Sequence, residues 1–140
     1  GHDVRFIADN RFKDYGIDTS INVHFLKMTR PYGNLFTKLK AVITMGLTFF
    51  QVLCWLIKHK PDMVVGFGGY PSFIPVKLAQ ILGKKTAIHE QNCLLGQANR
   101  WLAKKATSVM TAFKQVQALP KNITPLTRFT DNEWSSDGLC

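Results

Sequence analysis

The chain has 140 residues, 46% hydrophobic and 19% charged, which excludes a disordered chain and fits one globular domain with a sizeable core. Eighteen Lys and Arg against nine Asp and Glu give a net charge of +9, so an anionic partner such as phosphate, nucleic acid or lipid headgroup is expected. The three cysteines show no Cys-x-x-Cys spacing, so the sequence supports no zinc site, and we predict no bound metal or cofactor.

The first part of the chain is predicted to hold two strands and a long helix. Val4–Ala8 is a strand-like apolar run, and apolar residues alternate within Ile17–Leu26, which indicates a second, half-buried strand. A turn cluster at Thr29–Asn34 precedes a proline-free segment, Leu35–Lys60, in which Ala41–Ile57 carries no charge.

This apolar segment fits either a membrane span or a packed crossover helix. Seventeen residues at helical rise cover roughly 25 Å, which is at the short limit for a bilayer core. A polar stripe runs along the predicted helix: Thr44, Thr48, Gln51 and Lys58. We expect the strands before and after it to join one sheet, which a span would prevent, so we favour the crossover helix.

The same segment has a second possible role at a membrane surface. Its aromatic side chains include Phe49, Phe50 and Trp55, and the lysines that follow include Lys58 and Lys60. Apolar side chains bracketed by cations are typical of helices that rest on anionic lipid. A core helix with solvated lysines at its ends explains the pattern equally well.

The second part of the chain is predicted to alternate strands and helices. The expected elements, in order, are a strand at Met63–Phe67, a helix at Ser72–Leu82 with Pro71 in its first turn, a strand at Lys84–His89, a helix at Leu94–Lys105 and a strand at Thr107–Phe113. This alternation predicts a doubly wound α/β fold with a parallel sheet, whose ligands lie beyond the carboxyl ends of the strands.

Two turns at such strand ends carry the candidate chemistry. Gly68 and Gly69 allow positive φ and close approach of a ligand, and the helix start that follows favours an anion such as diphosphate. These glycines are equally consistent with a tight turn alone. The second turn places four polar residues in succession: His89, Glu90, Gln91 and Asn92.

The residues of the second turn also have purely structural explanations. Asn92 would suit a helix cap and His89 a satisfied core histidine. Four such residues opposite a glycine turn nevertheless favour a site. A nicotinamide-dependent oxidoreductase is disfavoured because no Gly-x-Gly-x-x-Gly is present, and no motif supports a nucleic-acid partner.

Three stretches, Pro61–Ser72, Ile88–Asn92 and Gly96–Ala103, closely resemble the MurG family of bacterial glycosyltransferases. The resemblance implies transfer of N-acetylglucosamine from UDP-N-acetylglucosamine to undecaprenyl-diphosphate-linked muramyl pentapeptide, which converts lipid I to lipid II in peptidoglycan biosynthesis. It also implies a GT-B fold, of which this chain would form part of the N-terminal, Rossmann-like acceptor domain. Peripheral attachment to the cytoplasmic face of the inner membrane is a further implication.

The resemblance also assigns roles by position. The acceptor diphosphate would lie on the turn formed by Gly68, Gly69, Tyr70, Pro71 and Ser72. Asn92 would contact the sugar-nucleotide donor, while His89 and Glu90 match polar residues important to activity. We do not assign Glu90 as the general base.

The sequence departs from the family pattern at both ends. The family's first loop, Gly-Gly-Thr-Gly-Gly-His, and its donor-binding domain have no counterpart in these residues. We therefore expect residues 1–119 to form a partial acceptor domain, residues 120–140 to form a poorly ordered divergent tail, and the chain to be inactive alone. The alternative is a noncatalytic, membrane-associated α/β module that binds lipid diphosphate.

Overall fold

The computed structural model describes residues 1–10, 13, 22–26, 34–113 and 115–127. The chain divides into two compact units, residues 1–60 and residues 61–140, and each is considered by itself.

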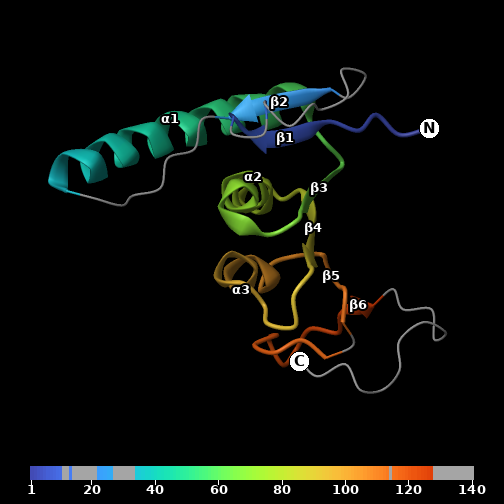
Figure 1. The fold of residues 1–140 in the computed structure, drawn as a ribbon. Helices are drawn as coiled ribbons and strands as arrows, with labels where there is room; N and C mark the ends of the chain where they lie inside the picture. The colour runs from blue at the N-terminus through green and yellow to red at the C-terminus, as the bar shows by residue number, and fades with distance from the viewer. Residues whose placement is uncertain (11–12, 14–21, 27–33, 114, 128–140) are drawn as a thin grey trace. The chain divides into compact units, whose positions relative to one another are not determined.

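The first unit contains a two-stranded parallel sheet and one long helix. Strand β1 (Phe6–Asp9) pairs with strand β2 (Val23–Leu26) in parallel, from Phe6 opposite Val23 to Asp9 opposite Leu26. Helix α1 (Leu35–His59) follows (Figure 1). The two strands and the helix confirm the sequence predictions, with both strands shorter than expected. The predicted turn at Thr29–Asn34 lies outside the described residues, apart from Asn34.

Helix α1 buries one member of the predicted polar stripe, Thr48, together with two apolar residues. Thr48, Val52 and Leu56 are buried and lie four residues apart, so they form the inward stripe. The Thr48 hydroxyl donates to the Thr44 carbonyl at 2.9 Å, within its own helix. Of the predicted polar stripe, Gln51 and Lys58 are exposed and Thr48 is buried, and both threonine hydroxyls bond to backbone carbonyls of the preceding turn.

Many large apolar side chains of α1 are instead exposed. They are Phe36, Val42, Ile43, Leu47, Phe49, Phe50 and Ile57. The stretch Val42–His59 is long and apolar enough to cross a membrane, a property that core helices of soluble proteins share. Only 17% of this stretch is buried, far less than a packed core helix would show.

The second unit is a parallel sheet with helices in its crossovers. Its elements are β3 (Met63–Gly66), α2 (Gly69–Ile81), β4 (Lys85–Glu90), α3 (Gln97–Ala103), β5 (Ser108–Thr111) and β6 (Leu126–Thr127). The strand order is β3-β4-β5-β6, and each neighbouring pair is parallel. Helices α2 and α3 pack together (Figure 1). The Gln80 side chain of α2 donates to the Leu102 carbonyl of α3 at 2.8 Å. The predicted α/β fold is confirmed.

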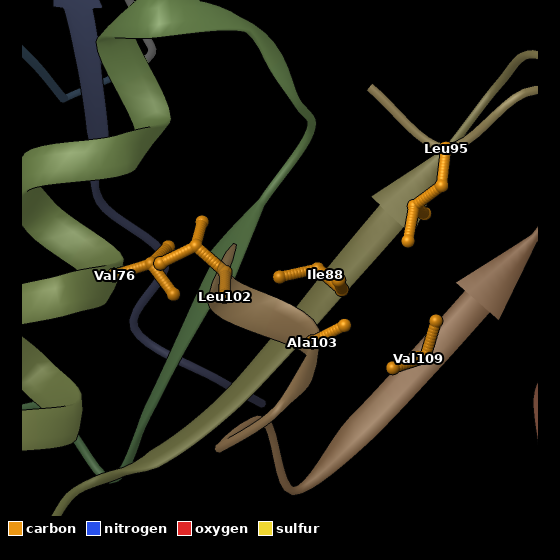
Figure 2. Close-up of a cluster of buried hydrophobic side chains, with 6 residues drawn as sticks. All are labelled: Val76, Ile88, Leu95, Leu102, Ala103 and Val109. Atoms are coloured by element: carbon orange, nitrogen blue, oxygen red, sulfur yellow. The ribbon is translucent and has the colours of Figure 1, made fainter. Parts of the chain in front are cut away.

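The core of this unit joins the sheet to both helices. Figure 2 shows the buried side chains that form it: Val76, Ile88, Leu95, Leu102, Ala103 and Val109. Ile88 and Val109 are paired in register on neighbouring strands, so the core crosses the sheet between β4 and β5. This packing fixes the carboxyl ends of the strands, where the candidate site lies.

Several element boundaries differ from the predictions. Helix α2 begins at Gly69, before Pro71, and continues through Pro75, which lacks an N–H to donate to the carbonyl four residues earlier. Helix α3 begins at Gln97, later than predicted, because Leu94 forms a bridge with Gln117. The two-residue strand β6 was not predicted.

The described strands form two sheets, β1-β2 and β3-β4-β5-β6, whereas one continuous sheet was expected.

Candidate functional site

Two turns of the second unit meet at one edge of the sheet because β3 and β4 are parallel neighbours. Gly66 at the end of β3 pairs with Ile88 of β4. The glycine turn (Gly68–Ser72) follows β3, and the polar turn (His89–Asn92) begins in the last residues of β4. A Cβ at Gly66 would lie 2.8 Å from Val76 Cγ2, so glycine at this position allows α2 to pack closely on the strand.

The glycine turn opens α2 with backbone conformations that favour glycine. Gly68 has φ 80° and ψ −178°, and Gly69 has φ 71°. A Cβ at Gly68 would lie 3.3 Å from Asn99 Nδ2. The Ser72 hydroxyl donates to the Gly68 carbonyl at 2.7 Å and closes the turn. Among the described residues no side chain caps the start of α2, so the N–H groups of its first turn have no side-chain acceptor.

Glu90 organises the polar turn. The residue is 4% exposed, yet four N–H donors surround its carboxylate. Oε1 accepts from the backbone N–H and the Nδ2 of Asn92, at 3.1 and 3.0 Å. Oε2 accepts from the Gly96 N–H at 2.8 Å and from Asn99 Nδ2 at 3.0 Å.

These contacts decide the ionisation of Glu90. Burial raises the pKa of the carboxyl group, but the hydrogen bonds from Gly96, Asn99 and Asn92 together outweigh burial and hold the pKa below its ordinary value of 4.5. The carboxylate is therefore charged near neutral pH, with both oxygens engaged. This arrangement suits a group that holds a turn in place and is poorly suited to proton transfer.

Asn99 links the two turns. Its side chain is 1% exposed, and Nδ2 also donates to the His89 carbonyl at 3.3 Å. The same nitrogen lies against Gly68. Gln91 adds a weaker link, from its Nε2 to the Phe67 carbonyl at 3.4 Å. The glycine turn and the polar turn are thus held together by side-chain amides.

His89 lies apart from this network. Its ring is half-buried, 5.8 Å from the Phe67 ring between centroids, and its Nδ1 is buried with no hydrogen-bond partner among the described residues. Successive residues of a strand point to opposite faces, so His89 and Glu90 diverge. The structure therefore separates the two residues that the resemblance marks as important to activity.

A cavity of about 450 Å³ opens between the two turns and α3. Its lining residues are Phe67, Gly68, Gly69, Phe73, Glu90, Gln91, Asn92, Gly96, Gln97, Ala98, Asn99 and Trp101. Of the predicted site residues, Gly68, Gly69, Glu90 and Asn92 line this cavity, while Pro71, Ser72 and His89 do not.

The remaining predicted residues fall elsewhere. The Tyr70 side chain lies outside the described part of the chain. The predicted membrane residues belong to the first unit: Phe49, Phe50, Lys58 and Lys60 are exposed, and Trp55 is half-buried. The Trp55 ring packs 4.7 Å from the His59 ring and 6.4 Å from the His24 ring, measured between centroids.

Sequence reasoning assigned no role to Gly96 or Asn99, although both donate to Glu90. Both lie in the stretch Gly96–Ala103 that resembles the MurG family, and this was the only signal that pointed to them. Nothing in the spacing alone indicates that they approach Glu90.

Comparison with known proteins supports that resemblance. The Glycosyltransferase family 28 N-terminal domain matches residues 1–111. The UDP-N-acetylglucosamine–N-acetylmuramyl-(pentapeptide) pyrophosphoryl-undecaprenol N-acetylglucosamine transferase of Rhodospirillum centenum is 38% identical over 120 residues, which cover 85% of this chain and 32% of the relative. The enzyme of the same name from Methylorubrum extorquens is 42% identical over 92 residues, which cover 66% of this chain and 25% of the relative.

A solved structure agrees with these matches. The crystal structure of MurG from Acinetobacter baumannii superposes with a TM-score of 0.69 at 27% identity, covering 89% of this chain and 36% of that one. The chain thus spans about a third or less of the length of these relatives. Because the family match extends over most of the 140 residues and the fold agrees with it, the chain belongs to glycosyltransferase family 28 and corresponds to part of its N-terminal domain.

Proposed function

We propose that this chain supplies the acceptor side of the site for transfer of N-acetylglucosamine from UDP-N-acetylglucosamine to undecaprenyl-diphospho-muramyl pentapeptide. The observation that carries the proposal is the junction of the two turns. An uncapped helix start at Gly68 and Gly69 borders the same cavity as Glu90 and Asn92. The names of the relatives give the donor and the lipid-linked acceptor.

The glycine turn supports binding of the acceptor diphosphate. Backbone N–H groups at the start of a helix attract anions, and α2 is long enough to have an appreciable dipole. Gly68 and Gly69 carry no Cβ atoms, so a phosphate oxygen can approach the backbone closely. Ser72 closes this turn through its hydroxyl and thus shapes the binding surface.

The polar turn supports contact with the donor. Asn92 is exposed and lines the cavity, and because its Nδ2 donates to Glu90, its Oδ1 is the atom that can accept from a sugar hydroxyl. Glu90 then acts as a positioning residue. His89 is the remaining group that the resemblance connects with activity. Its ring is half-buried with Nδ1 fully buried, and it does not line the cavity, which favours a supporting role over direct proton transfer.

The proposed reaction is a single inverting displacement. The muramyl 4-hydroxyl oxygen forms a bond to the anomeric carbon of N-acetylglucosamine, the bond from that carbon to the UDP diphosphate breaks, and the hydroxyl proton passes to a base. The leaving UDP takes the electron pair of the broken bond. None of the described residues of the cavity is suited to be that base, because Glu90 is fully hydrogen-bonded.

Equilibrium dialysis with a radiolabelled, short-chain soluble analogue of the acceptor tests this proposal. We expect saturable binding that Gly68→Ala weakens about tenfold and that Gly83→Ala leaves unchanged. Gly83 is a matched control because its φ is also positive, 68°, and it lies outside the cavity. Equal binding by both variants, or none by the wild-type chain, would contradict the proposal.

A transfer assay separates binding from turnover. With radiolabelled UDP-N-acetylglucosamine and lipid-linked acceptor, we expect the purified 140-residue chain to form no product. Measurable lipid II would show that these residues suffice for catalysis and would refute the assignment to the acceptor side alone.

We also propose that α1 attaches the protein to the cytoplasmic face of the inner membrane. The support is the exposure of Phe49, Phe50 and the other apolar side chains of α1, together with the exposed Lys58 and Lys60. Trp55 is a weaker candidate for lipid contact than either phenylalanine because it packs against two histidine rings.

The contribution of the lysine charges to membrane attachment can be measured separately from that of the apolar side chains. Lys58→Glu together with Lys60→Glu should weaken sedimentation with vesicles that contain anionic lipid, by about 1 kcal/mol per lysine or somewhat more on charge reversal, and leave any binding to neutral vesicles unchanged. An equal loss on both kinds of vesicle would contradict an electrostatic role for the lysines.

A further inference from the structure

The cavity beside the glycine turn has an unusual lining for a protein that binds phosphates. No Lys, Arg or His belongs to its described lining. Among the described lining residues the single charged side chain is Glu90, whose oxygens are already engaged by four N–H donors. The rest of the lining combines the aromatic residues Phe67, Phe73 and Trp101 with amide side chains.

Trp101 is the most exposed aromatic residue of this lining. Its neighbours on α3, Leu102 and Ala103, are buried in the core, whereas Trp101 is 62% exposed. An indole left in water forgoes the free energy of burial that such a large ring offers. A ligand with an apolar face would recover this free energy by covering the ring.

The amide side chains narrow the class of ligand. Gln91, Asn92 and Gln97 offer both donors and acceptors around the cavity, and the Lys104 ammonium lies 5.9 Å from the centroid of the Trp101 ring. A hydrocarbon chain would desolvate these groups without replacing their hydrogen bonds. A second phosphate would find no cation among the lining residues. A neutral, polar ring with one apolar face satisfies both parts of the lining.

We propose that the cavity is a subsite for an N-acylated hexopyranose, with Trp101 stacked on the C–H face of the sugar and Gln97 bonded to its hydroxyl or acylamino groups. The inference rests on the proposed function, in which the acceptor carries such a sugar directly on its diphosphate. Gly68 and Gly69 line this cavity, so a diphosphate on the glycine turn would place the attached sugar here. Trp101 and Gln97 thereby become specificity residues for the acceptor.

Tryptophan fluorescence provides the test. The chain has three tryptophans, so the variant Trp55→Phe/Trp134→Phe reports on Trp101 alone. Three probes are titrated separately: methyl N-acetyl-β-glucosaminide, methyl β-glucoside and inorganic pyrophosphate. We expect a saturable change with the N-acetyl sugar, and binding weaker by about fivefold or more for the glucoside, which lacks the acylamino hydrogen bonds.

Variants assign the response to the proposed contacts. Gln97→Ala should weaken sugar binding by about fivefold or more, while Gln115→Ala, an exposed glutamine outside the cavity, should not change it. Trp101→Leu, followed by calorimetry, should abolish measurable binding. If the variant without Trp55 fails to fold, ¹⁹F NMR of the wild-type chain labelled with 5-fluorotryptophan gives the same reading.

The outcomes separate this subsite from the proposed function. Pyrophosphate binding without any sugar response would overturn the sugar subsite and leave the diphosphate role intact. A sugar response without pyrophosphate binding would support the subsite and count against the diphosphate role. Absence of both, in a chain shown to be folded by circular dichroism, would overturn both.

Discussion

Helix α1 and the cavity of the second unit differ in which side chains they bury: the cavity buries a charged group, whereas α1 exposes large apolar side chains. In the second unit a charged carboxylate is buried, and four N–H donors compensate for its lost hydration. In α1, Thr48 lies on the inward stripe, whereas Phe36, Phe49 and Phe50 are exposed. Buried, satisfied polar groups specify a local geometry, whereas exposed apolar groups contribute little to folding. Internal hydrogen bonds thus hold the geometry of the cavity, whereas the outer face of α1 leaves apolar side chains exposed and available to a partner.

Removal of the Glu90 carboxylate should have the largest effect on stability. Glu90→Ala leaves the Gly96 N–H and the Asn92 and Asn99 side chains without their acceptor, so we expect a loss of about 3 kcal/mol in the free energy of unfolding. Urea denaturation followed by circular dichroism measures it. Gln91→Ala, which removes one long hydrogen bond of 3.4 Å, should cost about 0.5 kcal/mol or less. Similar losses for the two variants would show that the network is not specific to Glu90.

A methyl group at Gly68 should have the next largest effect. Gly68→Ala combines backbone strain at φ 80° with a Cβ placed 3.3 Å from Asn99 Nδ2, and we expect a loss of about 2 kcal/mol. Gly83→Ala carries the strain of φ 68° but has no atom within 4 Å of its Cβ, so about 1 kcal/mol is expected. Thermal unfolding of the two variants measures the difference. If Gly68→Ala were the milder change, the close approach of Asn99 to this turn would be refuted.

The stabilisation by Glu90 should depend on pH in a defined direction. Because the folded pKa is below the ordinary value of 4.5, the ionised carboxylate stabilises the fold above the unfolded pKa, and this stabilisation is lost as pH falls through the folded pKa. Glu90→Gln should therefore be less stable than wild type by about 1 to 2 kcal/mol at pH 7, and the gap should shrink below pH 4.5. Unfolding free energies of both proteins across this pH range measure it. A gap that widened on acidification would show that the folded state raises the pKa.

Substitutions on the outer face of α1 should have the smallest effect on stability. Leu47→Ser and Phe50→Ser replace side chains that are 62% and 64% exposed, so each should cost about 0.5 kcal/mol or less. The double variant should nevertheless weaken binding to anionic vesicles by about tenfold or more, because it removes apolar surface available to lipid. Sedimentation with vesicles measures the binding to lipid, and urea denaturation measures the free energy of unfolding. Leu56→Ala, at a buried position, should show the converse pattern of lost stability and retained binding per folded molecule.

The order of elements and the position of the two turns could be read from the sequence because their signals are local. Glycines and prolines mark the ends of elements, and Met63–Phe67 and Lys84–His89 have the apolar content of buried parallel strands. The role of Glu90 could not be read in this way. Its partners Gly96 and Asn99 lie six and nine residues along the chain, across a turn and a helix start whose geometry no spacing rule defines.

The buried side of α1 could not be predicted from the sequence for a related reason. A stripe of threonines at helical spacing shows that one face is polar, but not whether that face points inward. Thr44 and Thr48 donate their hydroxyls to backbone carbonyls of their own helix, and this bond offsets part of the cost of burying the Thr48 hydroxyl. Only the packing of Val52 and Leu56 identifies the inward stripe.

The central claim is that the glycine turn and the polar turn form one binding site, and NMR mapping tests it most directly. We would titrate the ¹⁵N-labelled chain with the short-chain acceptor analogue and follow the backbone amides of Gly69 and Gly96 and the side-chain amide of Asn92. If the two turns form one site, signals from both turns shift together along one saturation curve, and Gly68→Ala weakens both responses equally. Shifts confined to one turn, or confined to α1, would contradict a single site.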